Sequence, residues 1–269
     1  MVFNRSDSAR RAQPVSTATN TKRASSSLDE TPVLIVGGGP VGLTLALTLA
    51  QQGVASILVE RNPSTTTHPK MDITNGRSME LFRHLGVADE LREVAVPEDH
   101  PFDVSWVTKL DGSELARFRY PTPAQRRALI QECNDGTMAL EPAMRVSQAL
   151  LEPALKNLLE SRAPQIDIRF GWALHTFAQD ADGVDAVIRC TATGETRAIR
   201  AHFLAGCDGA GSAVRTGLGI GLDDIDPRRL AMRELGLGRL LPAAIRAYLS
   251  DRERPMDGRI FLKIGRAHV

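Results

Sequence analysis

The first ordered pattern along the chain alternates short apolar runs with a glycine-rich turn. Val33–Val36 is a four-residue run of Val, Leu and Ile, and Val54–Val59 is a second apolar run. Residues 43–50 between them are mostly Leu and Ala, as in a buried helix, and Gly53 follows as a stop signal. Short uninterrupted apolar runs are typical of buried parallel strands. The pattern predicts strand, turn, helix and strand in this order.

Weaker patterns extend this α/β reading towards the C-terminus. An amphipathic helix is predicted over 75–86, starting at Asn75 or Ser78, with Leu81, Phe82 and Leu85 on one face. Alternating residues on both sides of Asp111-Gly112 predict a hairpin over 102–120, and 146–162 is predicted to be a helix. Runs at 184–190 and 195–201 predict a β-meander, and a separate apolar strand starts at Phe203. We also expect a short helix with Ser212 as its N-cap.

The two ends of the chain have a different composition. Residues 1–30 are rich in Ser, Thr and Arg and poor in large apolar side chains, so we expect a disordered extension there, with mitochondrial targeting as the alternative. Residues 217–262 are rich in Leu and Arg and are expected to be helical, with a break at Pro242. Residues 263–269 (KIGRAHV) match the translation of a common sequencing adapter, so we expect a non-native tail after Leu262.

Composition excludes several classes of function. The 269 residues are 42% hydrophobic and 24% charged, and the net charge of +1 offers no footprint for nucleic acid or for an anionic membrane. The uncharged stretch 31–59 is interrupted by Gly37, Gly38, Gly39 and Pro40, so we do not interpret it as a membrane span. Three cysteines stand far apart without a histidine at ligand spacing, which predicts no metal site. We expect a cytoplasmic protein with reduced cysteines.

The turn after the first strand has the spacing of a dinucleotide-binding loop. Gly37, Gly39 and Gly42 form a GxGxxG, with Pro40 and Val41 at the expected start of the helix. In such a loop the glycines serve the tight turn, the approach of a pyrophosphate and close helix packing, respectively. Glu60 ends the next strand, where its carboxylate can bind ribose hydroxyls and would repel a 2′-phosphate. The spacing predicts a Rossmann-like site for FAD or NAD.

Four segments in a fixed order extend this reading to a family. They are Val33–Arg61, His68–Gly86, Arg145–Gln148 and the Asp-Gly segment at Asp208. Together they resemble the single-component FAD-dependent aromatic hydroxylases of the para-hydroxybenzoate and phenol hydroxylase type, over residues 31 to about 220. The resemblance implies a Rossmann-like FAD-binding domain with part of a mixed-sheet substrate domain.

The resemblance also assigns roles to residues. By the family pattern, Glu60 and Arg61 would contact the FAD adenosine, Lys70 would lie near the pyrophosphate, and Arg145 and Gln148 would reach the flavin side. Asp208 would belong to a segment linked to both FAD and NAD(P)H. Taken from the residues alone, Arg145 and Gln148 at i and i+3 on one helix would be solvated surface.

The implied reaction is hydroxylation of an aromatic or related organic substrate by O₂ and NAD(P)H, through a flavin C4a-hydroperoxide. The resemblance identifies no catalytic side chain, and the choice between NADH and NADPH, the substrate and the oligomeric state stay open. Two alternatives remain: a reductase or dehydrogenase of the same flavin fold, and a non-catalytic nucleotide-binding module.

The family's second Gly-Asp flavin segment has no counterpart after Leu218. We therefore expect a C-terminally truncated chain. Residues 31–262 would be the FAD-binding domain, interleaved with a partial substrate region at about 95–140 and 217–262. We expect this fragment to be inactive and to bind FAD weakly or not at all.

Overall fold

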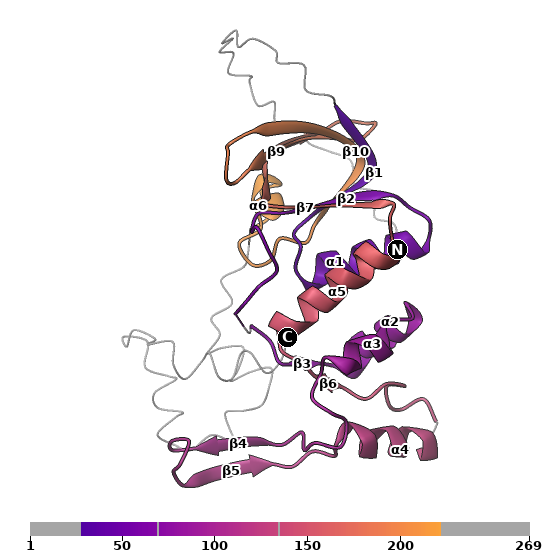
Figure 1. Ribbon diagram of the computed structural model, residues 1–269, viewed down its shortest axis with the longest axis vertical. Coiled ribbons are helices and arrows are strands. Elements are labelled where there is room, and N and C mark those ends of the chain that lie inside the picture. The colour runs from indigo at the N-terminus through magenta and orange to yellow at the C-terminus, as the bar shows by residue number, and fades with distance from the viewer. Residues whose placement is uncertain (1–27, 69, 134, 222–269) are drawn as a thin grey trace, which may run out of the picture.

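A computed structural model describes residues 28–68, 70–133 and 135–221, and its centre is a six-stranded sheet (Figure 1). The strand order is β7-β2-β1-β10-β9-β8. The bounds are β1 Asp29–Val36, β2 Ser56–Glu60, β7 Ile166–Phe170, β8 Trp172–Gln179, β9 Val184–Cys190 and β10 Thr196–Gly206. Strands β7, β2, β1 and β10 are parallel, whereas β8, β9 and β10 form an antiparallel meander. The predicted fold class, a parallel α/β sheet with a β-meander, is confirmed.

Two strand boundaries differ from the prediction. The runs at 195–201 and at Phe203 form a single strand, β10. Its backbone pairs with β1 from Ile199, opposite Asp29, to Gly206, opposite Val36. Strand β1 begins at Asp29, inside the segment predicted to be a disordered extension. The Asp29 carboxylate lies 2.6 Å from Arg169 Nη1, so both the ladder and an ion pair hold this end of the strand.

Two helices cover one face of the sheet. Figure 1 shows α1 (Pro40–Gln51) beside α5 (Gln148–Arg162) under the strands. Their apolar stripes bury Leu43 and Leu47 of α1 and Leu151, Leu155 and Leu159 of α5 against the sheet. On the other face, residues of β1 and β2 form a second core with residues of the meander: Leu34, Val36, Ile57, Val59, Ile188 and Ile199. Burial on both faces explains why Val33–Val36 of β1 and Ile57–Val59 of β2 are apolar without alternation.

Shorter elements lie beyond the two helices. Strand β3 (Ile73–Thr74) pairs with β6 (Met144–Arg145), and α2 (Gly76–His84) and α3 (Ala88–Glu93) follow β3 in the chain. Asn75 is the N-cap of α2, because its Oδ1 accepts a hydrogen bond from the Ser78 N–H at 2.9 Å. The predicted apolar face is partly wrong: Met79 and Phe82 are buried, but Leu81 is 47% exposed.

The predicted hairpin exists as β4 (Val104–Val107) and β5 (Glu114–Phe118), followed by α4 (Pro123–Cys133). Figure 1 shows these elements at the end of the molecule opposite the meander. Trp106 and Phe118 contact each other edge to face at 5.0 Å, yet both are largely exposed. The hairpin is therefore a two-stranded ribbon with little apolar cover from the described part of the chain.

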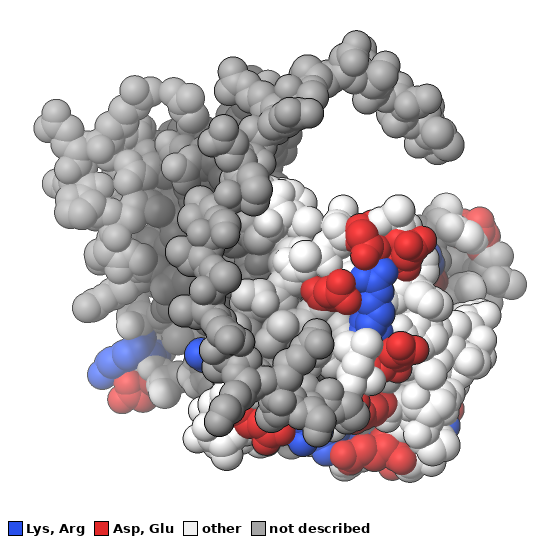
Figure 2. All heavy atoms as spheres, turned by 90° about the horizontal axis from the view of Figure 1, so that it is seen from above, with Lys and Arg blue, Asp and Glu red and all other residues white. Residues whose placement is uncertain are grey.

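The short helix α6 (Ala213–Gly217) follows β10, and Ser212 is its N-cap as predicted. Acidic and basic side chains lie side by side on the described part of the face in Figure 2. Within the described ranges, no helix combines the length and the apolar character needed to cross a bilayer. The predictions for residues 1–27 and 222–269, including the adapter-encoded tail, lie outside the described residues.

Candidate cofactor site

The glycine loop between β1 and α1 is built by close backbone contacts. Gly37 has φ +112°, and a Cβ there would lie 2.3 Å from the Cys207 carbonyl oxygen. At Gly42 a Cβ would lie 1.9 Å from the Gly37 carbonyl oxygen. A side chain at either position would collide with backbone, so both glycines are required by the turn itself. The loop is also tied to β2 by a hydrogen bond from the Gly37 N–H to the Val59 carbonyl at 2.8 Å.

Gly39 differs because open space lies in front of it. It is the N-cap of α1, with Pro40 in the first turn, and only Glu152 Oε1, at 3.9 Å, lies within 4 Å of the position of an added Cβ. Val41 in the same turn is 68% exposed. A helix N-terminus offers unpaired N–H groups and a positive dipole end, which favour a phosphate. This cradle fits the pyrophosphate of a dinucleotide.

Glu60 joins the loop to the end of β2. Its Oε2 accepts a hydrogen bond from the Gly38 N–H at 2.7 Å, and its Oε1 accepts from the N–H of Asn62 at 2.9 Å and from Asn62 Nδ2 at 2.6 Å. Each carboxylate oxygen has two lone pairs, so acceptor capacity remains for a ribose hydroxyl. Glu60 therefore lies where the fingerprint predicts it and also shapes the loop.

Gln148 approaches the same loop through Glu152. Gln148 Nε2 donates a hydrogen bond to Glu152 Oε1 at 2.6 Å, and the Thr66 N–H donates to Glu152 Oε2 at 2.8 Å. Glu152 is only 4% exposed. Since Glu152 Oε1 is the atom that faces Gly39, the structure brings Gln148 and the glycine loop together.

Arg145 belongs to strand β6, so its predicted place on a helix is wrong; α5 begins only at Gln148, after the N-cap Ser147. The reason is the antiparallel pairing of Arg145 with Ile73. Its guanidinium stacks over Phe102, with 4.7 Å from Cζ to the ring centroid. Arg145 Nε is buried without a hydrogen-bond partner among the described residues. Nε also forms a long ion pair with Asp72, whose Oδ2 lies 3.8 Å away.

Asp208 lies next to the loop but serves α6. A Cβ on Gly37 would approach the Asp208 Cα to 2.9 Å, which places the two segments in contact. The carboxylate accepts hydrogen bonds from the Ala213 N–H at 2.6 Å and from Ser212 Oγ at 2.5 Å. Its neighbour Cys207 is half-buried, and this burial raises the pKa of the Cys207 thiol.

Arg61 and Lys70 are the predicted site residues that the structure does not connect to the others. Both are exposed, and their side chains make no hydrogen bond or ion pair with described residues. Their proposed contacts with adenosine and pyrophosphate therefore rest on the family pattern alone.

The sequence reasoning missed Gly38 and Glu152. A Cβ on Gly38 would lie 2.7 Å from Glu60 Cβ, a contact between segments that no local pattern reveals. Glu152 gave a readable signal, because it lies on the stripe formed by Gln148, Leu155 and Leu159 at helical spacing. A carboxylate in a buried stripe is uncommon without a partner or a role.

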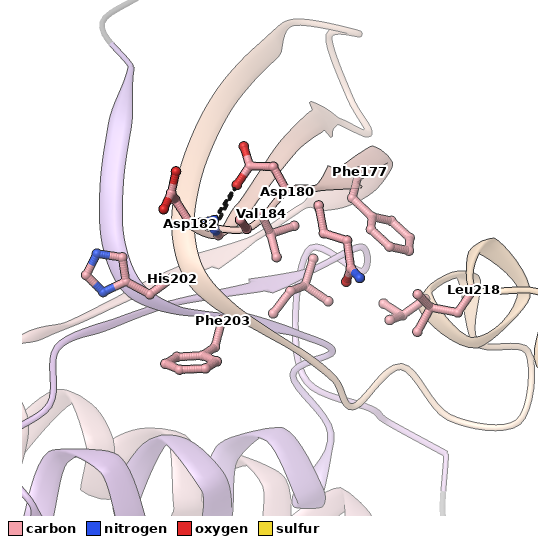
Figure 3. A pocket seen from close by; sticks show the side chains of 12 residues that line it. Phe177, Asp180, Asp182, Val184, His202, Phe203 and Leu218 are labelled. Carbon is pink, nitrogen blue, oxygen red and sulfur yellow. Dashed lines mark hydrogen bonds between the residues drawn. The ribbon is translucent and has the colours of Figure 1, made fainter. Parts of the chain in front are cut away.

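A separate cavity of about 480 Å³ lies at the meander (Figure 3). Asp180, Asp182 and His202 line it together with the apolar side chains of Phe177 and Leu218. None of the predicted cofactor residues lines this cavity. The dinucleotide loop and the cavity are thus different places on the sheet.

Comparison with known proteins agrees with this geometry. Residues 30–230 match the family model described as "FAD binding domain". The chain is 47% identical over 199 residues to the FAD-dependent monooxygenase apdD of Emericella nidulans, covering 73% of this chain and 32% of apdD. It is 35% identical over 193 residues to phenol 2-monooxygenase of a Pseudomonas species, covering 71% of this chain and 30% of that protein.

Solved structures give the same result. The flavin-dependent monooxygenase PieE in complex with FAD and substrate is 36% identical, with a TM-score of 0.64 over 72% of this chain and 33% of PieE. The rebeccamycin biosynthetic enzyme RebC with reduced flavin is 40% identical, with a TM-score of 0.61 over 72% of this chain and 35% of RebC. The chain spans about a third of the length of these curated relatives. With a family match over residues 30–230, the chain belongs to the FAD-binding domain family.

Proposed function

We propose that this chain is the FAD-binding part of a monooxygenase that hydroxylates an aromatic or related organic substrate, with O₂ and NAD(P)H as co-substrates. The observation that carries the cofactor assignment is the open cradle at Gly39, at the N-terminus of α1. The names of the relatives, which include phenol and 2,4-dichlorophenol monooxygenases, support the reaction and the substrate class.

The residues that would hold FAD form a path from the loop towards β6. The N-terminus of α1 would bind the pyrophosphate, with Lys70 as a nearby cation, and Glu60 and Arg61 would contact the adenosine. Gln148 and Arg145 would reach the flavin side, where the Arg145 guanidinium stacks over Phe102. Asp208 would hold α6 and the Gly37 turn in place rather than touch the cofactor.

A bound FAD supplies the electron transfer from NAD(P)H and the reaction with O₂. The chain's own residues would bind and orient the cofactor and keep water from it. The exposed ribbon of β4 and β5, which carries Trp106 and Phe118, would form one wall of the substrate region.

FAD titration of the purified chain tests the cofactor assignment. We expect weak, saturable binding, which the quenching of flavin fluorescence would measure. A Gly39→Asp variant places a negative charge in the cradle and should abolish binding. Equal affinity of both proteins would contradict the assignment.

The reaction needs a second assay, on the polypeptide that the genomic reading frame encodes around this chain. We expect phenolic substrates to stimulate NAD(P)H oxidation, and ¹⁸O from ¹⁸O₂ to appear in a hydroxylated product. Stimulated oxidation without labelled product would instead indicate a reductase or dehydrogenase.

A further inference from the structure

Glu152 is a buried carboxylate that the cofactor assignment does not use. Its two oxygens have different partners: Oε2 accepts from the Thr66 N–H at 2.8 Å, and Oε1 accepts from Gln148 Nε2 at 2.6 Å. No described cation forms an ion pair with it. A carboxylate that is only 4% exposed is costly to bury without partners, so the groups that its hydrogen bonds arrange are the natural place to look for its role.

The first consequence concerns the amide of Gln148. An ionised carboxylate can only accept, so it fixes the NH₂ side of the Gln148 amide towards itself. Gln148 Oε1 then points away from Glu152, and no described residue donates a hydrogen bond to this oxygen. Gln148, which is linked to the glycine loop through Glu152, therefore presents an acceptor that no described residue uses.

The second consequence concerns charge. Glu152 Oε1 lies 3.9 Å from the position of a Cβ at Gly39, where the cradle would hold an anionic pyrophosphate. Through its charge alone, Glu152 would weaken the binding of such an anion. A contribution of Glu152 to cofactor binding would therefore come from the geometry of its hydrogen bonds and not from its charge.

We propose that Glu152 is a positioning residue of the FAD site, which orients the Gln148 amide so that Gln148 Oε1 accepts a hydrogen bond from a hydroxyl or ring N–H of FAD. The inference rests on the proposed function and adds to it a residue that does not touch the cofactor. Through Thr66, the same carboxylate also holds the segment after β2 against α5.

Substitutions at Glu152 and Gln148, first singly and then with the two side chains exchanged, test the proposal. In Glu152→Gln the new amide oxygen accepts from the Thr66 N–H, so its NH₂ group faces Gln148 and turns that amide around. The cofactor then meets a donor in place of an acceptor, and we expect FAD affinity to fall about tenfold, the effect of one lost hydrogen bond. Glu160→Gln is the matched control, because Glu160 lies on the same helix, exposed and paired with Lys156.

The double variant Glu152→Gln/Gln148→Glu separates orientation from simple disruption. Its carboxylate at 148 accepts from the new amide at 152 and offers a second oxygen to FAD, so we expect affinity to return to within about threefold of the unsubstituted chain. Gln148→Glu alone places two carboxylates in contact and should bind poorly. Tighter FAD binding by Glu152→Gln, or no recovery in the double variant, would overturn the proposal.

A measurement without cofactor keeps the test independent of FAD binding and of variant folding. In ¹⁵N-labelled unsubstituted protein, the Gln148 side-chain amide should give one proton shifted downfield and protected from exchange. Signals of a freely exchanging amide would overturn the positioning role of Glu152 and leave the proposed FAD site untouched. Failure of the unsubstituted chain to bind FAD would instead overturn the proposed cofactor role, and with it the contact made by Gln148.

Discussion

The Glu60 carboxylate accepts a hydrogen bond from the Gly38 N–H at 2.7 Å, across 22 positions of the chain. This bond joins the end of β2 to the middle of the glycine loop. The fingerprint assigns Glu60 to a ribose, yet the structure shows that the same carboxylate also holds the loop that would bind the pyrophosphate. Glu60 therefore links the proposed ribose position at the end of β2 to the proposed pyrophosphate position at the glycine loop.

Glu60→Gln should weaken both the fold and the cofactor site. The amide oxygen can still accept from Gly38, but the NH₂ group then faces the backbone N–H and Nδ2 of Asn62, and both of these donors lose their partner. We expect the free energy of unfolding to fall by about 1–2 kcal/mol and FAD affinity to fall with it. Urea denaturation of the apo protein and FAD titration measure the two effects.

The control for this change is Glu195→Gln, which breaks an exposed pair with Arg197. Exposed pairs contribute little, so we expect a change within about 0.5 kcal/mol. Equal destabilisation by the two substitutions would show that Glu60 has no special role in the loop.

Alanine substitutions at Gly42 and Gly39 should separate folding from binding. A Cβ at Gly42 meets the Gly37 carbonyl oxygen at 1.9 Å, so Gly42→Ala should cost about 3 kcal/mol of stability. At Gly39 the Cβ enters open space at φ −77°, so Gly39→Ala should change stability by about 1 kcal/mol or less. FAD binding should nevertheless fall in Gly39→Ala, because its methyl group occupies the cradle.

Thermal denaturation without FAD and fluorescence titration with FAD measure these two quantities on each variant. A stable Gly42→Ala protein would contradict the packing described for the loop. Unchanged FAD affinity in Gly39→Ala would contradict the place assigned to the pyrophosphate.

Local signals predicted the parallel core and the loop well. The runs at Val33–Val36 and Val54–Val59 are short and apolar because these strands are buried on both faces, and Gly42 is required by the carbonyl of Gly37, five residues away. These features leave a trace in the local pattern.

Non-local pairing accounts for what the sequence did not reveal. Arg145 is in a strand because Ile73 pairs with it, and β10 continues through Phe203 because β1 runs beside it. The contacts of Glu152 with Thr66 and of Gly38 with Glu60 likewise join distant segments. Neither residue composition nor periodicity specifies such a partner.

The cysteines Cys190 and Cys207 should differ in reactivity although both are partly buried. Hydrogen bonds from Thr193 lower the pKa of Cys190, whereas burial raises the pKa of Cys207. The thiolate is the reactive form, so at pH 8 iodoacetamide should modify Cys190 before Cys207. Time-resolved peptide mass spectrometry gives the order, and faster labelling of Cys207 would contradict it.

The raised pKa of Cys207 also has a consequence for stability. The folded chain keeps the thiol proton to higher pH than the unfolded chain. The contribution of Cys207 to the free energy of unfolding is therefore full below about pH 8.5 and is lost as the pH rises further. Cys207→Ala should remove this part of the alkaline loss of stability, which denaturant titrations at pH 7.5 and 9.5 would measure.

Phe203→Thr should improve solubility without unfolding the sheet. Phe203 is 71% exposed on β10, whereas its register partner Val33 on β1 is only 9% exposed. A β-branched Thr suits a strand, so the free energy of unfolding should change by about 0.5 kcal/mol or less while an exposed aromatic surface disappears. Val33→Thr, the matched change on the buried partner, places a hydroxyl in the core and should cost about 1–3 kcal/mol. Light scattering and urea denaturation of both variants decide the matter, and a large loss of stability in Phe203→Thr would show that this ring packs in the folded chain.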